Sequence, residues 1–165
     1  MGNINWGNLL FGFSGRINRA KWWLTVLVTI IISVVIQLVV AINETVGGIL
    51  ALISFIVTIW IGLAAGAKRL HDLNRTAAWL VVFYGVPIVL IIILIAYAGM
   101  SLGAAVLTGG ADNLDASALV GLGGIAIVII VLVMAVGIWS FIWFGCLRGT
   151  VGPNQYGPDP LEGRV

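Results

Sequence analysis

The chain has 165 residues, of which 61% are hydrophobic and only 8% are charged. A soluble domain ordinarily carries about 25% charged residues, so this chain has too few charges to cover a water-exposed surface. The balance excludes an ordinary soluble domain and indicates a single integral membrane domain. The net charge of +2 does not indicate nucleic-acid binding, because the basic residues flank hydrophobic stretches rather than one soluble face.

Hydrophobic stretches without a charged residue recur along the chain, at residues 22–42, 46–67, 77–97 and 121–146. Each is long enough to cross a hydrocarbon core of about 30 Å as a helix of about 20 residues. In lipid, backbone amides must find partners within the same segment, which a helix provides. The sequence therefore predicts an all-α, integral membrane four-helix bundle. Pro87 lies inside the third stretch and predicts a kink near Phe83, whose carbonyl it crowds.

The distribution of basic residues predicts the orientation. All 8 Lys and Arg residues lie in the segments 1–21, 68–76 and 147–165, whereas 43–45 and 98–120 contain only acidic charges. The positive-inside rule places the basic segments in the cytoplasm. We expect an N-in/C-in topology with 43–45 and 98–120 in the periplasm. The longer of these is predicted to be a loop, with a short helix capped by Asn113 or Asp115 as a variant of that prediction.

Small and hydroxylated residues recur at every fourth position of the first two stretches. Such residues stay nearly in line on a helix, let membrane helices approach closely, and can hydrogen-bond across the seam. A polar substrate path is the alternative, which the lack of an ionisable group in either stripe disfavours. The predicted seam residues are Thr25, Thr29, Ser33 and Gln37 in the first stretch and Ser54, Thr58, Gly62 and Gly66 in the second.

Polar motifs are concentrated in three of the predicted cytoplasmic parts. A Gly-Arg-x-x-Arg-x-x-Trp-Trp run ends at Trp23, an Arg-Leu-His-Asp run ends at Asp72, and Asn-x-Tyr-Gly-Pro-Asp-Pro ends at Pro160. With these motifs in this order, the chain resembles the bacterial inner-membrane family named domain of unknown function 805. It departs from that family at residues 76–80, where Ser-Gly-Trp-Trp is usual. The resemblance implies a multi-pass protein of the bacterial inner (plasma) membrane and no particular activity.

These polar segments allow two interpretations. In one, the basic residues, Lys68 included, form a collar at lipid headgroups, each gaining about 1 kcal/mol near an anionic leaflet. In the other, an arginine pairs with Asp72 or Asp159 and ties loop and tail into a small cytoplasmic cap. The Pro- and Gly-rich tail either folds back, with Tyr156 as a plug, or is disordered. The candidate cap and headgroup residues are Arg16, Arg19, Lys21, Arg69, His71, Asp72, Arg75, Asn154, Tyr156 and Asp159, with Arg16 and Arg19 as the pairing arginines.

The neighbouring His71 and Asp72 suggest a general base, but adjacent residues of a helix point about 100° apart. The sequence offers neither a set of metal ligands nor a phosphate-binding or nucleophile motif. We therefore expect no enzyme, no cofactor and no nucleic-acid partner. The functional hypothesis is a non-enzymatic structural or accessory subunit of the inner membrane, in contact with membrane lipids and associating with itself or with other membrane subunits. The alternative is a small passive transporter or channel for lipid or a small solute.

Overall fold

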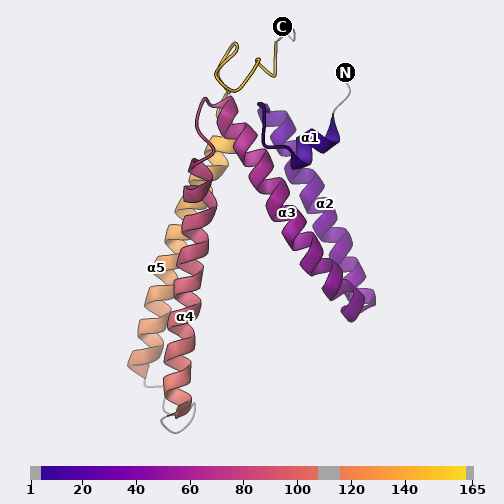
Figure 1. Ribbon diagram of the computed structural model, residues 1–165. Coiled ribbons are helices and arrows are strands. Elements are labelled where there is room, and N and C mark those ends of the chain that lie inside the picture. The colour runs from indigo at the N-terminus through magenta and orange to yellow at the C-terminus, as the bar shows by residue number, and fades with distance from the viewer. Residues whose placement is uncertain (1–4, 108–115, 163–165) are drawn as a thin grey trace. The chain divides into compact units, whose positions relative to one another are not determined.

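The computed structural model describes residues 5–107 and 116–162, which form helices joined by turns (Figure 1). Within these ranges there is no strand, only an isolated bridge between Asn154 and Gly157. Among the same residues, 4 helices are long and apolar enough to cross a membrane: Arg19–Ile42, Glu44–Asp72, Val81–Gly103 and Val120–Cys146. The predicted all-α membrane fold is therefore confirmed.

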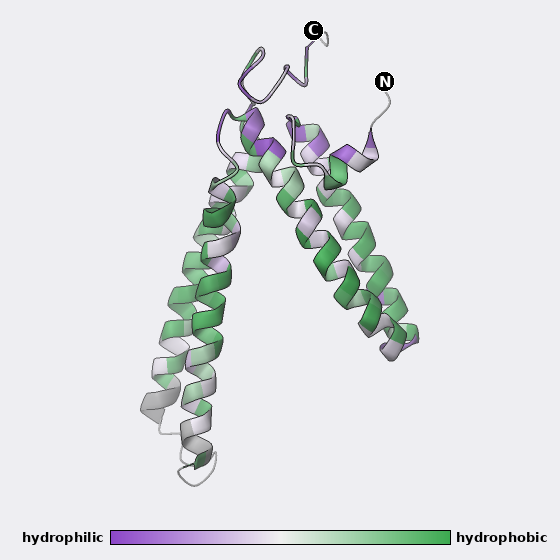
Figure 2. Cartoon of the chain, viewed as in Figure 1, coloured by the Kyte–Doolittle hydropathy of each residue, from purple (hydrophilic) through white to green (hydrophobic). Residues whose placement is uncertain are grey.

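The helices belong to two compact units. The first combines Met1–Leu80 with Phe141–Val165, and the second is Val81–Ser140. In the first unit, hydrophobic residues run along the two long helices, and hydrophilic residues gather around the short first helix and the end of the third (Figure 2). The helical elements of the first unit are α1 (Trp6–Phe11), α2 (Arg19–Ile42), α3 (Glu44–Asp72) and the π-helical turn η3 (Ile142–Cys146).

A single residue, Asn43, separates α2 from α3. Its N–H donates to the Val39 carbonyl at 2.9 Å and caps the end of α2. Its side-chain oxygen accepts the N–H of Val46 at 3.0 Å and caps the start of α3. Glu44 and Thr45, predicted to belong to the turn, therefore lie in the first turn of α3. The tight turn makes α2 and α3 an antiparallel hairpin.

The hydroxyl groups along this hairpin donate to their own helices. Thr25 donates to the Trp22 carbonyl at 2.7 Å, and Ser54 donates to the Ala51 carbonyl at 3.0 Å. A helical Ser or Thr reaches a carbonyl three or four residues earlier without any neighbouring helix. The same pattern holds for Thr29, Ser33 and Thr58. These hydroxyls therefore do not donate across the seam, and the facing of the two stripes stays a prediction.

A close approach of the two helices occurs near the turn. A Cβ atom at Gly47 would collide with the backbone of Val40 on α2, so only glycine fits there. Along the predicted stripes, Thr25 and Gly66 are buried, whereas Ser33 and Gln37 are exposed. The glycine that this hairpin requires is thus outside the four-residue pattern.

The second unit begins with a π-helical turn, η1 (Val81–Gly85), followed by α4 (Val86–Leu107), and α5 spans Ala116–Phe141. Pro87 has no N–H to give to the carbonyl four residues earlier, and its ring crowds that carbonyl. The helix forms a π turn at Val81–Gly85. The distortion predicted near Phe83 is therefore present as a π turn. The Phe83 ring packs edge-on against Trp139, with ring centroids 5.3 Å apart.

The helices extend past several predicted span ends. Residues 68–72, predicted as loop, form the last turn of α3, and α4 continues to Leu107 while α5 begins at Ala116. The prediction of a loop over 98–120 is therefore wrong for 98–107. Residues 116–120 are helical, as the variant with a helix after Asn113 or Asp115 predicts, but they belong to the long helix α5 and not to a separate short one. Small residues lower the hydropathy there, but alanine and leucine favour a helix. The predicted helix caps at Asn113 and Asp115 lie outside the described residues.

Candidate functional site

Three parts of the first unit that are distant in sequence meet beside the end of α3. We call them the polar cap, which consists of residues 6–18, 68–75 and 147–162. Backbone hydrogen bonds join the parts: Ile17 N–H donates to the Lys68 carbonyl at 3.4 Å, and Thr150 N–H donates to the Asp72 carbonyl at 2.8 Å. Side chains from all three parts therefore share one environment.

A buried cluster of Arg16, Asp72 and Arg69, here called the Arg–Asp–Arg cluster, lies at the centre of the polar cap. Arg16 Nη2 lies 3.1 Å from Asp72 Oδ1, and Arg69 Nη1 lies 2.6 Å from Asp72 Oδ2. The side chains of Arg16, Arg69 and Asp72 are only 1%, 0% and 4% exposed. Because α3 continues to Asp72, Arg69 and Asp72 share one helical face three residues apart. Of the pairings that the sequence left open, the structure contains that of Arg16 with Asp72.

The remaining N–H groups of Arg16 bind the C-terminal tail. Nη1 donates to the carbonyls of Gly152 at 2.8 Å and Gly157 at 3.2 Å, and Nη2 donates to the Thr150 carbonyl at 2.6 Å. Thr150 was not among the predicted site residues, although its hydroxyl accepts from Arg16 Nη2 at 3.1 Å and from Asn154 Nδ2 at 2.9 Å and donates to the Asp72 carbonyl at 3.1 Å. A lone threonine in a polar tail has no distinctive sequence pattern, and the carbonyls of Thr150, Gly152 and Gly157 carry no residue-type signal, so only the structure identifies them.

Arg69 binds the chain where the last spanning helix ends. Nε donates to the Phe144 carbonyl at 2.8 Å, and Nη2 donates to the Leu147 carbonyl. The carbonyls at a helix C-terminus lack intrahelical partners, and a guanidinium satisfies them. Gly149 also belongs to the site, because a Cβ there would overlap the Asp72 carboxylate. It was not among the residues predicted from the sequence.

Lys68 is buried as well, with 1% of its surface exposed. Its ammonium donates to the carbonyls of Asn8 and Leu9 at the end of α1, the latter at 2.7 Å. The interpretation that Lys68, Arg69 and Arg16 form a collar at lipid headgroups is therefore wrong for these three residues. Each has backbone carbonyls or Asp72 within reach, and these partners compensate for the loss of water.

The energetics of such a cluster are asymmetric. Removing water from a charge costs several kcal/mol, and the cost is offset only when good partners surround it. Across residues 5–107 and 116–162, no buried side-chain nitrogen or oxygen lacks a hydrogen-bond partner. The intact cluster is therefore tolerated, whereas removal of Asp72 leaves two buried guanidinium groups without a counter-charge.

The tail folds back onto α3 through His71. The rings of His71 and Tyr156 stack with centroids 4.0 Å apart and an interplanar angle of 8°. Asn154 donates through Nδ2 to the His71 carbonyl at 2.9 Å, and His71 Nδ1 lies 3.2 Å from the Gly15 carbonyl. Of the two alternatives for the tail, the structure contains the folded one. His71 thus joins the tail to the segment before α2.

Asp159 closes a turn of the tail. Its carboxylate accepts the N–H of Gly152 at 2.8 Å and the N–H of Leu161 at 2.9 Å. These hydrogen bonds favour the charged form and lower the pKa of Asp159 below its ordinary value. Gly152 and Gly157 have φ values of +78° and +134°, which residues other than glycine rarely adopt.

The other predicted basic residues lie at the edge of the polar cap. Arg19 is exposed and donates through Nη1 to the Cys146 carbonyl at 2.9 Å. Arg75 is exposed and lies 5.7 Å from the centroid of the Trp143 ring, a cation–π contact. Lys21 is half-buried in the first turn of α2.

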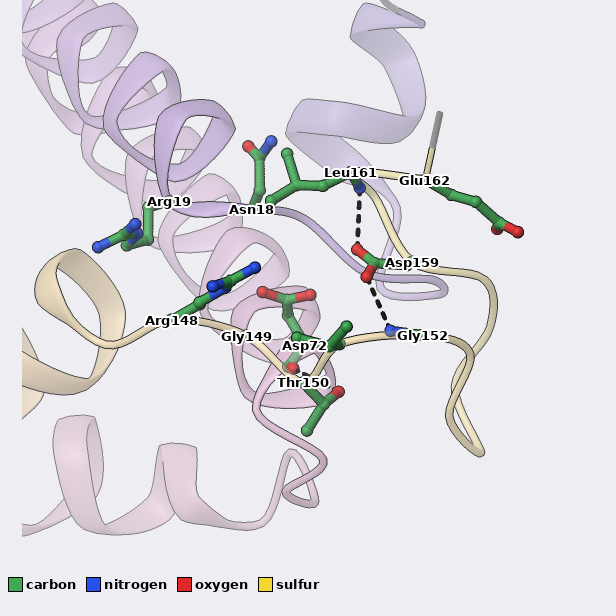
Figure 3. A pocket seen from close by; sticks show the side chains of 11 residues that line it. Asn18, Arg19, Asp72, Arg148, Gly149, Thr150, Gly152, Asp159, Leu161 and Glu162 are labelled. Atoms are coloured by element: carbon green, nitrogen blue, oxygen red, sulfur yellow. Dashed lines mark hydrogen bonds between the residues drawn. The ribbon is translucent and has the colours of Figure 1, made fainter. Parts of the chain in front are cut away.

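A cleft of about 410 Å³ opens beside the Arg–Asp–Arg cluster (Figure 3). It lies wholly within the first unit. Arg19 and Arg148 lie toward one end of it, and Asp159 and Glu162 lie toward the other. In the part of the chain that the structure describes, no group of three or more His, Cys, Asp or Glu is placed to hold a metal ion.

Comparisons with known proteins identify the family of the chain. The family described as "Protein of unknown function (DUF805)" matches residues 10–106. The chain is 30% identical over 152 residues to inner membrane protein YhaI of Escherichia coli K12, which covers 92% of this chain and 88% of that protein. The chain belongs to the DUF805 family. YhaI of Escherichia coli O157:H7 matches to the same extent, and no solved structure matches.

This DUF805 protein is thus a multi-pass protein of the inner membrane, as its motifs led us to expect. The family match includes Arg16, Arg69 and Asp72 but ends before the tail that Arg16 binds. The match to YhaI extends over most of the chain.

Proposed function

We propose that this inner-membrane protein is a non-enzymatic structural or accessory subunit that associates with itself or with a larger membrane complex. The observation that carries the proposal is how the buried charges are used. Arg16, Arg69 and Asp72 bind one another and the backbone of two other segments. Groups engaged in this way hold the helix ends together and are not directed at a substrate.

The long helices offer apolar surface for lateral contacts. On α3, Leu52, Phe55 and Ile56 are 69%, 64% and 68% exposed. In a bilayer these side chains meet either lipid tails or another helix, and helix association there depends on packing. This surface supports the role of a subunit.

The alternative, a passive transporter or channel, receives less support. A path for a polar solute needs polar groups that can face it. The hydroxyls of Thr25, Thr29 and Ser33 are instead engaged with carbonyls of their own helix. These residues suit packing better than conduction.

Purification from native membranes tests the proposal. Two copies of the full chain with different tags are co-expressed, extracted in a mild detergent and captured through one tag. We expect species larger than the 17.5 kDa monomer, containing either the second tag or a stoichiometric partner. Alanine at Leu52, Phe55 and Ile56 should reduce capture without lowering the amount of protein in the membrane. A bare monomer in every mild detergent would contradict the proposal.

We also propose that the polar cap faces the cytoplasm. The supporting observation is that all 8 Lys and Arg residues lie in segments 1–21, 68–76 and 147–165, which a chain with four spans places on one side of the membrane. Single cysteines at Thr45 and Glu162, in a chain with Cys146 replaced by serine, report the topology. An impermeant maleimide applied to intact spheroplasts should modify position 45 only. Labelling at 162 would reverse the assignment.

A further inference from the structure

The cleft beside the Arg–Asp–Arg cluster is lined by charged residues that do not belong to the ion pairs of the cluster. Asp72 lines it, but both of its oxygens are bound by Arg16 and Arg69. Arg148 and Glu162 are exposed lining residues at opposite ends, so both can reach a bound molecule. Their charges are therefore available for binding.

The charged residues toward the two ends of the cleft balance in number and are separated in space. Arg19 already donates to the Cys146 carbonyl and Asp159 already accepts two backbone N–H groups, but these partners are neutral, so both charges remain uncompensated. Arg19 and Arg148 supply two positive charges toward one end, and Asp159 and Glu162 supply two negative charges toward the other (Figure 3). A lining of this kind is poorly matched to a simple anion, which the acidic end repels. It is matched to a molecule that carries both charges a short distance apart.

The position of the cleft indicates the source of such a molecule. Arg19 is the first residue of the spanning helix α2, and Arg148 follows the span Val120–Cys146 by two residues. Basic side chains at the ends of spanning helices lie at the level of the phospholipid headgroups. The cationic end of the cleft is therefore within reach of lipid phosphates.

We propose that this cleft binds the headgroup of a phospholipid that carries a phosphate and a primary ammonium, as in phosphatidylethanolamine. The guanidinium groups of Arg19 and Arg148 would bind the phosphate, which suits their forked N–H geometry. The carboxylates of Asp159 and Glu162 would accept the three N–H donors of the ammonium. A quaternary ammonium has no such donors and favours aromatic rings instead. This site goes beyond the proposed accessory role and does not require a partner subunit.

Native mass spectrometry of the full-length, delipidated protein tests the site. With equal amounts of phosphatidylethanolamine and phosphatidylglycerol present, we expect the former to be retained with a preference of about tenfold, the effect of an added charge-assisted hydrogen bond. Water-soluble phosphoethanolamine should displace the bound lipid at concentrations where inorganic phosphate does not. Equal retention of the two lipids, or equal displacement by the two soluble compounds, would overturn the proposal.

Exposed residues at the two ends allow variants that leave the fold intact. Arg148→Gln should lower retention of phosphatidylethanolamine about tenfold, because phosphate loses a charged donor. Glu162→Gln should reduce the preference over phosphatidylglycerol, because the ammonium loses one of its two carboxylate acceptors and the anionic lipid is repelled less. Lys21→Gln is the matched control, since it removes a positive charge at the same end of α2 but outside the cleft. Wild-type retention by Arg148→Gln would also overturn the proposal.

Discussion

The polar cap and the α2–α3 hairpin are held together by different physics. In the cap, the buried side chains of Arg16, Lys68 and Arg69 donate to backbone carbonyls up to 141 residues away in sequence. In the hairpin, hydroxyls stay on their own helix and contact depends on small residues such as Gly47. Cap geometry is therefore specified by directional bonds, whereas the hairpin is specified by shape. Substitutions should affect the two regions to different extents.

The largest effect is expected from Asp72→Asn. The amide keeps the shape of the side chain but leaves the guanidiniums of Arg16 and Arg69 buried without a counter-charge. Breaking a buried ion pair from one side typically costs about 3–5 kcal/mol. The free energy of unfolding, measured by SDS titration with tryptophan fluorescence, should fall by that order. Glu44→Gln, an exposed carboxylate at the start of α3, should cost no more than about 1 kcal/mol. Equal losses would mean that the cluster contributes no special stability.

A smaller effect is expected in the hairpin, from Gly47→Ala. The new Cβ collides with the Val40 backbone, so α2 and α3 must separate. Overpacking of this kind costs about 1–3 kcal/mol. Gly48→Ala is the control on the next residue, where no atom lies within 4 Å of the added Cβ. Because alanine favours helix over glycine by about 1 kcal/mol, that variant should be neutral or more stable. The free energy of unfolding of both variants is measured by the same SDS titration. A Gly47→Ala variant more stable than the wild type would contradict the close approach of α2 and α3.

The hairpin was more predictable from the sequence than the cap for a physical reason. Stretches such as 22–42 need only enough apolar length to cross the membrane, and hydropathy records that length directly. Helix ends were less predictable. The region around Gly99 and Gly103 contains small residues that read as a loop but are accommodated within α4.

In the cap, the sequence identified the right residue types but not their environment. The strongly hydrophilic side chains of Lys68 and Arg69 are expected at the surface, whereas both are almost completely buried. Their partners are mainly carbonyls, such as that of Phe144, 75 residues from Arg69. A carbonyl is present in every residue, so no local pattern reveals which one a side chain will meet. The Arg16–Asp72 pair was among the predictions because both partners are charged.

The tail should lose less stability than the cluster when its contact with α3 is removed. Tyr156→Ala abolishes the stack on His71, and aromatic pairs contribute about 0.5–1.5 kcal/mol beyond their buried area. We expect faster proteolysis within residues 150–162 and a nearly unchanged SDS titration. Tyr156→Phe keeps the ring and should be cleaved at the wild-type rate. Cleavage of Tyr156→Ala at that same rate would mean that the hydrogen bonds of Arg16, Thr150 and Asn154 hold the tail without the stack.

The smallest expected effect concerns the turn that Asp159 closes. Hydrogen bonds from Leu161 and Gly152 lower its pKa below the ordinary value of 3.8 in the folded state. A depressed carboxyl pKa means that the turn is stabilised above the unfolded value and loses this contribution as pH falls through the folded value. The amide signals of Gly152 and Leu161, followed by NMR in detergent, should therefore shift with a midpoint below 3.8.

Asp159→Asn should abolish that titration of the two amide signals. A midpoint at or above 3.8 in the wild-type protein would show that the two amides do not hold the charged form. The cap would then be closed by Arg16 and the Tyr156 stack without a contribution from this carboxylate. Because the turn is at the surface, its loss should leave the Arg–Asp–Arg cluster intact, which distinguishes local opening from unfolding of the whole cap.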